Sequence, residues 1–146
     1  MECEFPTINA NKDEMREIFN NTKTIAIIGC SPNETKDSNK VAKYLIDNGF
    51  TVIPVYPKGE YILGQKVYRS LKDIPVPVDM VDIFRKPEVI PYIVDVAIKR
   101  GDVKYIWSQL GLVNNKAMEK AEAHGIKAIQ NYCTKLEHKA LKEAKL

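Results

Sequence analysis

The chain alternates five short apolar runs with segments in which apolar residues recur at helical spacing. Runs of this length without polar alternation are typical of strands buried on both faces of a parallel sheet. Parallel neighbours must be joined by right-handed crossovers. The sequence therefore predicts a doubly wound, five-stranded parallel α/β sheet flanked by helices, with strand order 3-2-1-4-5. The five predicted strands are Thr24–Ile28, Thr51–Val55, Val78–Phe84, Val103–Trp107 and Ile126–Ile129.

The segments between these runs carry helix start and stop signals. Ser38 is a candidate N-cap, and Gly49 suits a left-handed C-terminal cap. Thr134 and Glu137 match the spacing of a capping box. We therefore expect helices over 11–20, 38–48, 87–100 and 115–124, and a last helix that starts near Thr134.

Composition excludes several classes of protein. With 146 residues, 45% of them apolar, the chain suits one domain with a sizeable core. We expect residues 1–146 to form that domain, with 1–22 as a helical extension packed on it. The net charge of +3 is small and the lysines are dispersed, which argues against a nucleic-acid partner. No apolar stretch approaches the ~18 residues of a membrane helix, so we expect no membrane association.

Cysteine usage favours a cytoplasmic protein. Cys3, Cys30 and Cys133 are odd in number and widely spaced, which argues against a disulfide framework or a zinc site. The first residues are acidic and polar, unlike a secretory signal. We therefore expect reduced thiols and a cytoplasmic location.

The first predicted strand turns sharply at Gly29 and leads through a polar loop to a helix start. Glycine lets a backbone approach a ligand closely, and the free N–H groups at a helix start attract phosphate. The second glycine of a G-x-G-x-x-G motif is missing, because Cys30, Ser31 and Pro32 follow Gly29. The turn therefore indicates either a phosphate site or an ordinary turn of an α/β domain.

The end of the second predicted strand bears on the identity of the nucleotide. An NAD site places a carboxylate near this point, to bind the ribose hydroxyls. This chain has Tyr56, Pro57 and Lys58 instead. A lysine attracts a phosphorylated ribose, so Lys58 favours coenzyme A or NADP over NAD.

Polar residues follow the carboxyl ends of four predicted strands. In a doubly wound sheet, ligands bind beyond these ends, where the strand order reverses. With the order 3-2-1-4-5, that crevice would lie between the first and fourth strands. The loops that would converge there carry Gly29 and Ser31, Tyr56 and Lys58, Phe84 and Arg85, and Gln109 and Gly111.

The segments IAIIGCSP, VIPVYPK, ILGQKVYRSL, VDIFRKPE, IWSQLG and NYCTKLEH occur in this order from about Thr24 onward. In this they resemble small stand-alone coenzyme A-binding proteins, which are similar to the nucleotide-binding domain of the succinyl-CoA synthetase alpha subunit. The resemblance implies a Rossmann-like domain that binds coenzyme A or an acyl-CoA. It implies no catalysed reaction.

The resemblance also implies roles for matching residues. The turn of Gly29, Cys30, Ser31 and Pro32 would meet the pyrophosphate, flanked by Asn39 and Lys40. Tyr56, Pro57 and Lys58 would face the ADP ribose and its 3′-phosphate. Phe84 and Arg85 would border the adenine or the phosphates, and Gln109 and Gly111 the pantetheine arm.

A catalytic site has little support in the sequence. His124 and His138 lack a neighbouring nucleophile or metal-ligand set, and we expect Asp79 and Asp82 to be solvated at the sheet edge. Binding without catalysis is therefore the preferred interpretation, and an NADP-dependent oxidoreductase or other nucleotide enzyme is the alternative. A further hypothesis is that Cys30 or Cys133 forms a mixed disulfide with coenzyme A. A helix start can lower the pKa of the Cys133 thiol, which would make it more reactive. A homodimer or another protein partner stays open.

Overall fold

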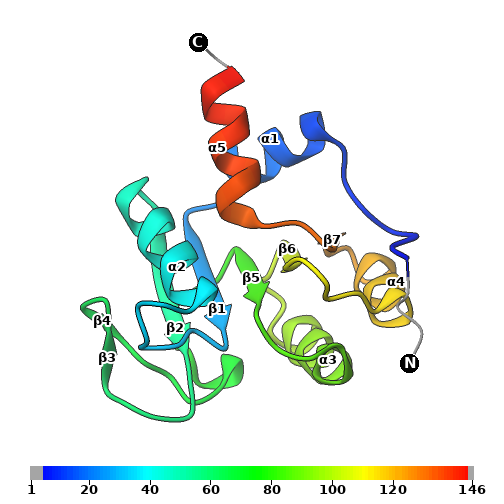
Figure 1. Ribbon diagram of the computed structural model, residues 1–146. Coiled ribbons are helices and arrows are strands. Elements are labelled where there is room, and N and C mark those ends of the chain that lie inside the picture. Colours follow the sequence, from blue (N-terminus) through cyan, green and yellow to red (C-terminus); the bar gives the residue numbers. More distant parts are fainter. Residues whose placement is uncertain (1–4, 145–146) are drawn as a thin grey trace.

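The computed structural model describes residues 5–144. Its main sheet is parallel and runs in the order β2-β1-β5-β6-β7 (Figure 1). The strands are β1 (Thr24–Ile28), β2 (Thr51–Val55), β5 (Met80–Ile83), β6 (Tyr105–Ser108) and β7 (Lys127–Ile129). The five-stranded parallel α/β architecture expected from the apolar runs is confirmed.

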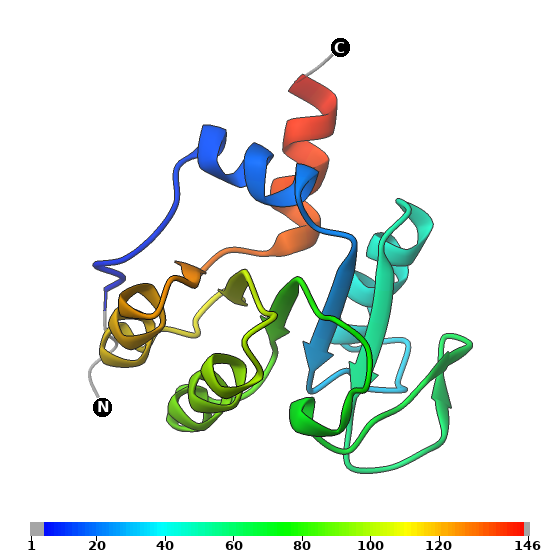
Figure 2. The same ribbon diagram turned by 180° about the vertical axis from the view of Figure 1, so that it is seen from behind.

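The predicted strand order is wrong at one place. β5 pairs with β1, from Ile25 opposite Met80 onward, and not with β2. The outer edge of β2 is already occupied, because the backbone of Tyr68 accepts from Tyr56 N and donates to Pro54 O, both at 3.0 Å. A hairpin of β3 (Tyr61–Ile62) and β4 (Gln65–Lys66) lies beside this edge (Figure 2). The order therefore reverses between β1 and β5, and the crevice lies there.

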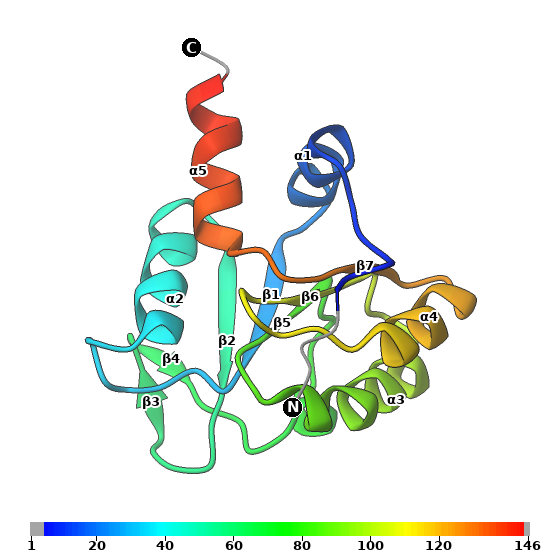
Figure 3. The ribbon, with the colours of Figure 1, turned by 45° about the vertical axis from the view of Figure 1, so that its right-hand side comes forward.

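Helices cover both faces of the sheet (Figure 3). Alternate residues of β1 enter two cores: Ile25 and Ile27 pack with one set of helices, and Ala26 and Ile28 with the other. The first set is α1 (Lys12–Asn20), α2 (Asp37–Asp47) and α5 (Thr134–Ala144), and the second is η1 (Leu71–Asp73), α3 (Ile90–Arg100) and α4 (Asn115–Ala123). A short turn of helix, η2 (Pro87–Val89), precedes α3. Within residues 5–144, no helix has the length and apolar character needed to cross a membrane.

Two predicted helix caps are wrong, and one is confirmed. Gly49 follows α2 with φ +92°, as expected of a left-handed cap. Ser38 lies inside α2, whose N-cap is Lys36, and its hydroxyl accepts from Ser31 N at 3.0 Å. Thr134 is the first residue of α5, and its hydroxyl serves the buried network described below. Both hydroxyls therefore hold neighbouring segments in place.

The β7 edge of the sheet is closed by a segment from near the N-terminus. The Asn9 carboxamide donates to Gln130 O at 2.9 Å and accepts from Gln130 N at 3.0 Å. It thus pairs like a peptide group of a neighbouring strand. Lys127 Nζ also donates to Asn9 O at 3.0 Å. Both edges of the sheet are therefore covered at these points: the β2 edge by Tyr68, and the β7 edge by Asn9.

Candidate functional site

The turn after β1 packs against the first residues beyond β5. Gly29 has φ +87°, a conformation that L-residues with a side chain rarely adopt. A Cβ at Gly29 would lie 2.7 Å from Phe84 O and 3.0 Å from Arg85 Cδ. Glycine is therefore required here for both conformation and space, and the turn holds the start of the loop after β5 at the switch point.

Ser31 anchors the loop between this turn and α2. Its N–H donates to Ser38 Oγ at 3.0 Å, and its carbonyl accepts from Asn39 Nδ2 at 2.9 Å. Asn39 is only 4% exposed, so its amide supports the loop from beneath. The loop is thus fixed to the first turn of α2, and Lys36 at the N-cap position makes no capping hydrogen bond through its side chain. N–H groups at this helix start remain available to an anion.

Two adjacent cavities lie over the switch point and share Asp37, Phe84 and Arg85. One, of about 560 Å³, is lined by polar and apolar groups around the Gly29 turn. The other, of about 480 Å³, extends toward the start of α5 and has a largely apolar wall. A third cavity of about 150 Å³ adjoins the Gly29 turn on its other side. The lining also includes Ser31, Lys36, Tyr56 and Pro57 in the first cavity, Lys40, Lys86, Gln109, Leu110, Cys133, Lys135 and Leu136 in the second, and Tyr56, Pro57, Arg69 and Tyr92 in the third.

Positive charge dominates the walls of the first two cavities. The two walls together hold five cations and one carboxylate, that of Asp37. The cations are Lys36, Lys40, Arg85, Lys86 and Lys135. Among the residues that the structure describes, none of these five forms an ion pair. Unpaired cations beside a glycine turn and a helix start suit an anionic ligand with phosphate groups.

A buried polar network lies beneath the second cavity. Gln109 Nε2 donates to Asp82 Oδ1 at 2.5 Å and to Thr134 Oγ1 at 3.0 Å, and Thr134 Oγ1 donates to Asp82 Oδ2 at 2.9 Å. Asp82 is 0% exposed, so the expectation that it is solvated at the sheet edge is wrong. Burial raises the pKa of the Asp82 carboxyl to about 7, although the hydrogen bonds from Gln109 and Thr134 oppose the shift.

Asp79, in contrast, lies just before β5, at the opposite edge of the sheet. Its carboxylate accepts from the N–H groups of Lys23 and Thr24 at 2.9 and 3.0 Å. Partial burial acts to raise its pKa, but these bonds and the nearby Lys104 ammonium outweigh burial and lower the pKa. The two acids of one strand segment therefore have opposite environments.

The thiols also differ from expectation. Cys30 is 0% exposed, and burial, together with the nearby Asp82 carboxylate, raises the pKa of its thiol to about 12. Cys133 lines the second cavity, but burial raises its pKa as well, although the N–H groups of Leu136 and Lys135 act the other way. The expected lowering of the Cys133 pKa is wrong. A disulfide with a ligand thiol thus remains a hypothesis for Cys133, whereas Cys30 is sealed in the core.

Alkylation should separate the two thiols. In a Cys3→Ser background, used because Cys3 lies outside the described residues, iodoacetamide should add once, at Cys133. The rate should rise with pH, because the thiolate is the nucleophile and its pKa is raised. Intact mass gives the number of adducts. An adduct that forms equally fast after Cys133→Ser would contradict this prediction.

The structure brings many of the predicted site residues together at the cavities. Those that line a cavity are Gly29, Ser31, Lys40, Tyr56, Pro57, Phe84, Arg85 and Gln109. Those that line none of the cavities described here are Cys30, Pro32, Asn39, Lys58 and Gly111. Cys30 is in the core, and Gly111 donates its N–H to Asn131 Oδ1 at 2.7 Å.

Sequence reasoning missed several cations of the site. Lys36 directly precedes α2, and Lys135 is the second residue of α5. The charge of these two residues does not distinguish them from ordinary surface lysines. Arg69 lies in the irregular segment after β2, and its Nη1 donates to Tyr56 O at 3.2 Å. Its position depends on the pairing of Tyr68 beside β2, for which the sequence holds no signal.

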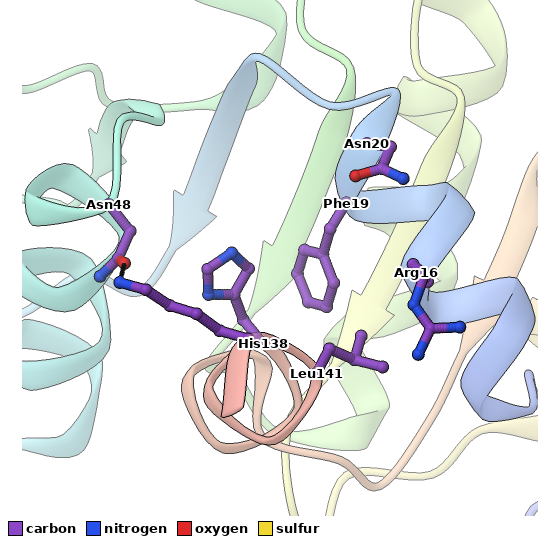
Figure 4. Close-up of a pocket in the computed structure, with 7 residues that line it drawn as sticks. Arg16, Phe19, Asn20, Asn48, His138 and Leu141 are labelled. Atoms are coloured by element: carbon purple, nitrogen blue, oxygen red, sulfur yellow. Dashed lines mark hydrogen bonds between the residues drawn. The ribbon is translucent and has the colours of Figure 1, made fainter. Parts of the chain in front are cut away.

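A further cavity of about 290 Å³ lies between α1, α2 and α5, away from the switch point (Figure 4). Asn20 and Asn48 at its wall mark the carboxyl ends of α1 and α2, where the helix dipoles are negative. Lys142 Nζ donates to Asn48 Oδ1 at 2.9 Å, and His138 Nδ1 lies 2.8 Å from the Tyr44 hydroxyl. The other cation of this wall, Arg16, is also bonded, to Asp13, so this cavity is less suited to phosphate than the cavities at the switch point.

Comparison with known proteins gives the chain a family context. Residues 23–139 match the family described as the CoA binding domain. An uncharacterized protein of Bacillus subtilis is 35% identical over 92% of this chain and 98% of its own length. An ADP-forming acetate–CoA ligase of Methanocaldococcus jannaschii is 30% identical over 76% of this chain, but the match spans only 17% of the ligase. The larger relatives found are thus acetate–CoA ligases, and the likeness to succinyl-CoA synthetase is a looser one.

Solved structures agree with the fold. A hypothetical protein from Pyrococcus horikoshii superposes with a TM-score of 0.88 at 39% identity, and covers 97% of this chain and 99% of its own. A dinucleotide-forming acetyl-coenzyme A synthetase from Ca. Korarchaeum cryptofilum superposes with a TM-score of 0.64 over 77% of this chain and 26% of its own. At 22% identity, the second likeness concerns the fold alone.

Proposed function

The chain belongs to the family of CoA-binding domains, and we propose that it binds coenzyme A or an acyl-CoA at the carboxyl edge of its sheet. The observation that carries this proposal is the meeting of the Gly29 turn, over two adjacent cavities, with five cations that form no ion pair within residues 5–144. We assign the chain a binding role, without a reaction of its own.

The pyrophosphate fits best at the first cavity. There the Gly29 backbone allows close approach, the start of α2 offers N–H groups, and Arg85 supplies a guanidinium. An Arg guanidinium can bind two phosphate oxygens at once, whereas a Lys ammonium acts as a point charge. Arg85 borders all three cavities at the switch point, so it is the residue that most of the ligand would touch.

The remaining parts of coenzyme A suit the other two cavities. The second cavity combines apolar side chains, such as Phe84 and Leu136, with the amide of Gln109, as the pantetheine arm requires. The third cavity offers Tyr56 and Tyr92 to the adenosine. Arg69 lines it too and is a second candidate, beside Lys58, for the 3′-phosphate of the ribose.

Calorimetric titration tests this assignment. Wild-type protein should bind coenzyme A more tightly than NADP or NAD. Arg85→Ala should weaken coenzyme A binding roughly 10- to 100-fold, since a charged hydrogen bond contributes about 1.5–3 kcal/mol. Lys99→Ala, an exposed cation in the last turn of α3, is the matched control and should bind normally.

Two further variants locate the ribose phosphate. A loss confined to Lys58→Ala would assign the phosphate to Lys58, and a loss confined to Arg69→Ala would assign it to Arg69. Tighter binding of NADP than of coenzyme A would reject the proposed ligand and support the oxidoreductase alternative.

A further inference from the structure

The Gln109 side chain is held from beneath by two sealed groups. Its Nε2 donates to both Asp82 Oδ1 and Thr134 Oγ1, and each of these partners is 0% exposed. A primary amide has two N–H donors. Both donors of Gln109 are therefore used inside the protein.

The other end of the same amide is open. Within residues 5–144, Gln109 Oε1 has no hydrogen-bond partner. No oxygen without a partner is fully buried in this part of the chain, so Gln109 Oε1 is accessible to solvent. Gln109 is 5% exposed and lines the second cavity, so this oxygen is accessible from the cavity. When a ligand fills this mostly apolar cavity and displaces water, the oxygen needs a donor from the ligand, because an acceptor buried without a partner costs free energy.

The partners also fix which end of the amide faces the cavity. An ionised carboxylate can only accept hydrogen bonds, so Asp82 in that form selects the NH₂ end of Gln109. Thr134 completes the arrangement, because its hydroxyl accepts from Gln109 while it donates to Asp82. A reversed amide would place its oxygen against the carboxylate.

We propose that Asp82 and Thr134 are positioning residues that hold the Gln109 carbonyl oxygen toward the second cavity, so that the site selects a ligand group that donates a hydrogen bond. This inference rests on the proposed binding of coenzyme A. In coenzyme A the pantetheine arm has amide N–H donors and ends in a thiol S–H. An acyl-CoA retains the amide donors and lacks the thiol donor.

The test compares coenzyme A with acetyl-CoA on wild-type protein, Gln109→Met and Asp82→Asn. Gln109→Met keeps the length of the side chain and removes the acceptor, and should weaken coenzyme A binding about tenfold. Asp82→Asn should weaken coenzyme A binding by several-fold, because an asparagine can donate to Gln109 Oε1 and let the amide reverse.

The comparison of the two ligands identifies the donor. If the donor is the thiol, wild type should prefer coenzyme A and Gln109→Met should lose that preference. If the donor is an amide N–H, both ligands should weaken equally.

Gln130→Met is the matched control, since Gln130 is also buried but bonds to Ile8, Asn114 and Asn115, away from the cavities. It should bind coenzyme A as wild type does. Unfolding is followed for every variant, so that loss of binding is not confused with loss of fold. Unchanged binding in Gln109→Met would overturn the selection of a donor, and unchanged binding in Asp82→Asn would overturn its positioning role. No binding of coenzyme A by wild type would instead overturn the proposed function.

Discussion

Gly29→Ala should lower the free energy of unfolding by roughly 3 kcal/mol and weaken coenzyme A binding by more than about tenfold. A non-glycine residue in the left-handed region costs about 1–2 kcal/mol, and the new Cβ would also lie 2.7 Å from Phe84 O. Relief of that contact moves the residues after β5, among them Arg85. Denaturant unfolding and calorimetric titration measure the two effects.

Gly125→Ala separates conformational strain from crowding. Gly125 has φ +83°, close to the value at Gly29, but a Cβ there would meet no atom within 4 Å. This control should lose only about 1–2 kcal/mol and keep its affinity for coenzyme A. Equal losses of stability in the two variants would show that the contact with Phe84 has no energetic weight.

Asp82→Asn should stabilise the protein increasingly as the pH rises from 4 to 7. The pKa of this carboxyl is about 7 in the folded protein and about 3.8 when unfolded. Its contribution to stability is therefore complete below pH 4 and is lost as the pH approaches 7. A shift of this size corresponds to about 4 kcal/mol, so the two proteins should differ little at pH 4 and by that order at pH 8. Denaturant unfolding at several pH values gives the difference.

Asp79→Asn is the control of opposite sign. Its carboxyl has a lowered pKa, so the wild-type group stabilises the fold above pH 4 and loses this effect as the pH falls. The substitution should therefore destabilise the protein at neutral pH and matter less in acid. Parallel pH curves for wild type and Asp82→Asn would contradict the burial of a titrating carboxyl at that position.

The strands were predictable because each is a short, mostly apolar run, and β1 and β2 match the predicted ranges. The order of the strands was not predictable, because it depends on what fills the edge beside β2. The connection from β2 to β5 has no α-helix to mark its path. The backbone pairing of Tyr68 fixes it beside β2, and the Arg100 guanidinium binds carbonyl groups farther along it. That pairing involves backbone groups, which every sequence offers.

The site was partly predictable for the same physical reason. Residues that follow parallel strands meet at one edge, so Gly29, Phe84, Arg85 and Gln109 could be grouped from the sequence. The burial of Asp82 could have been predicted from its position, because a residue in the middle of a strand buried on both faces cannot reach solvent. Its partners are Gln109, directly after β6, and Thr134, the first residue of α5, and such long-range pairs leave no local pattern.

The contact of Asn9 with Gln130 has a consequence for the newly made chain. An open strand edge can pair with another molecule and begin aggregation. The Asn9 side chain can cover β7 only after Gln130 has been synthesised, 121 positions later in the sequence. From then on Asn9 covers this edge. Cells should therefore accumulate more insoluble material when Asn9 is replaced by a side chain unable to pair with the backbone, because the completed sheet would keep an open edge.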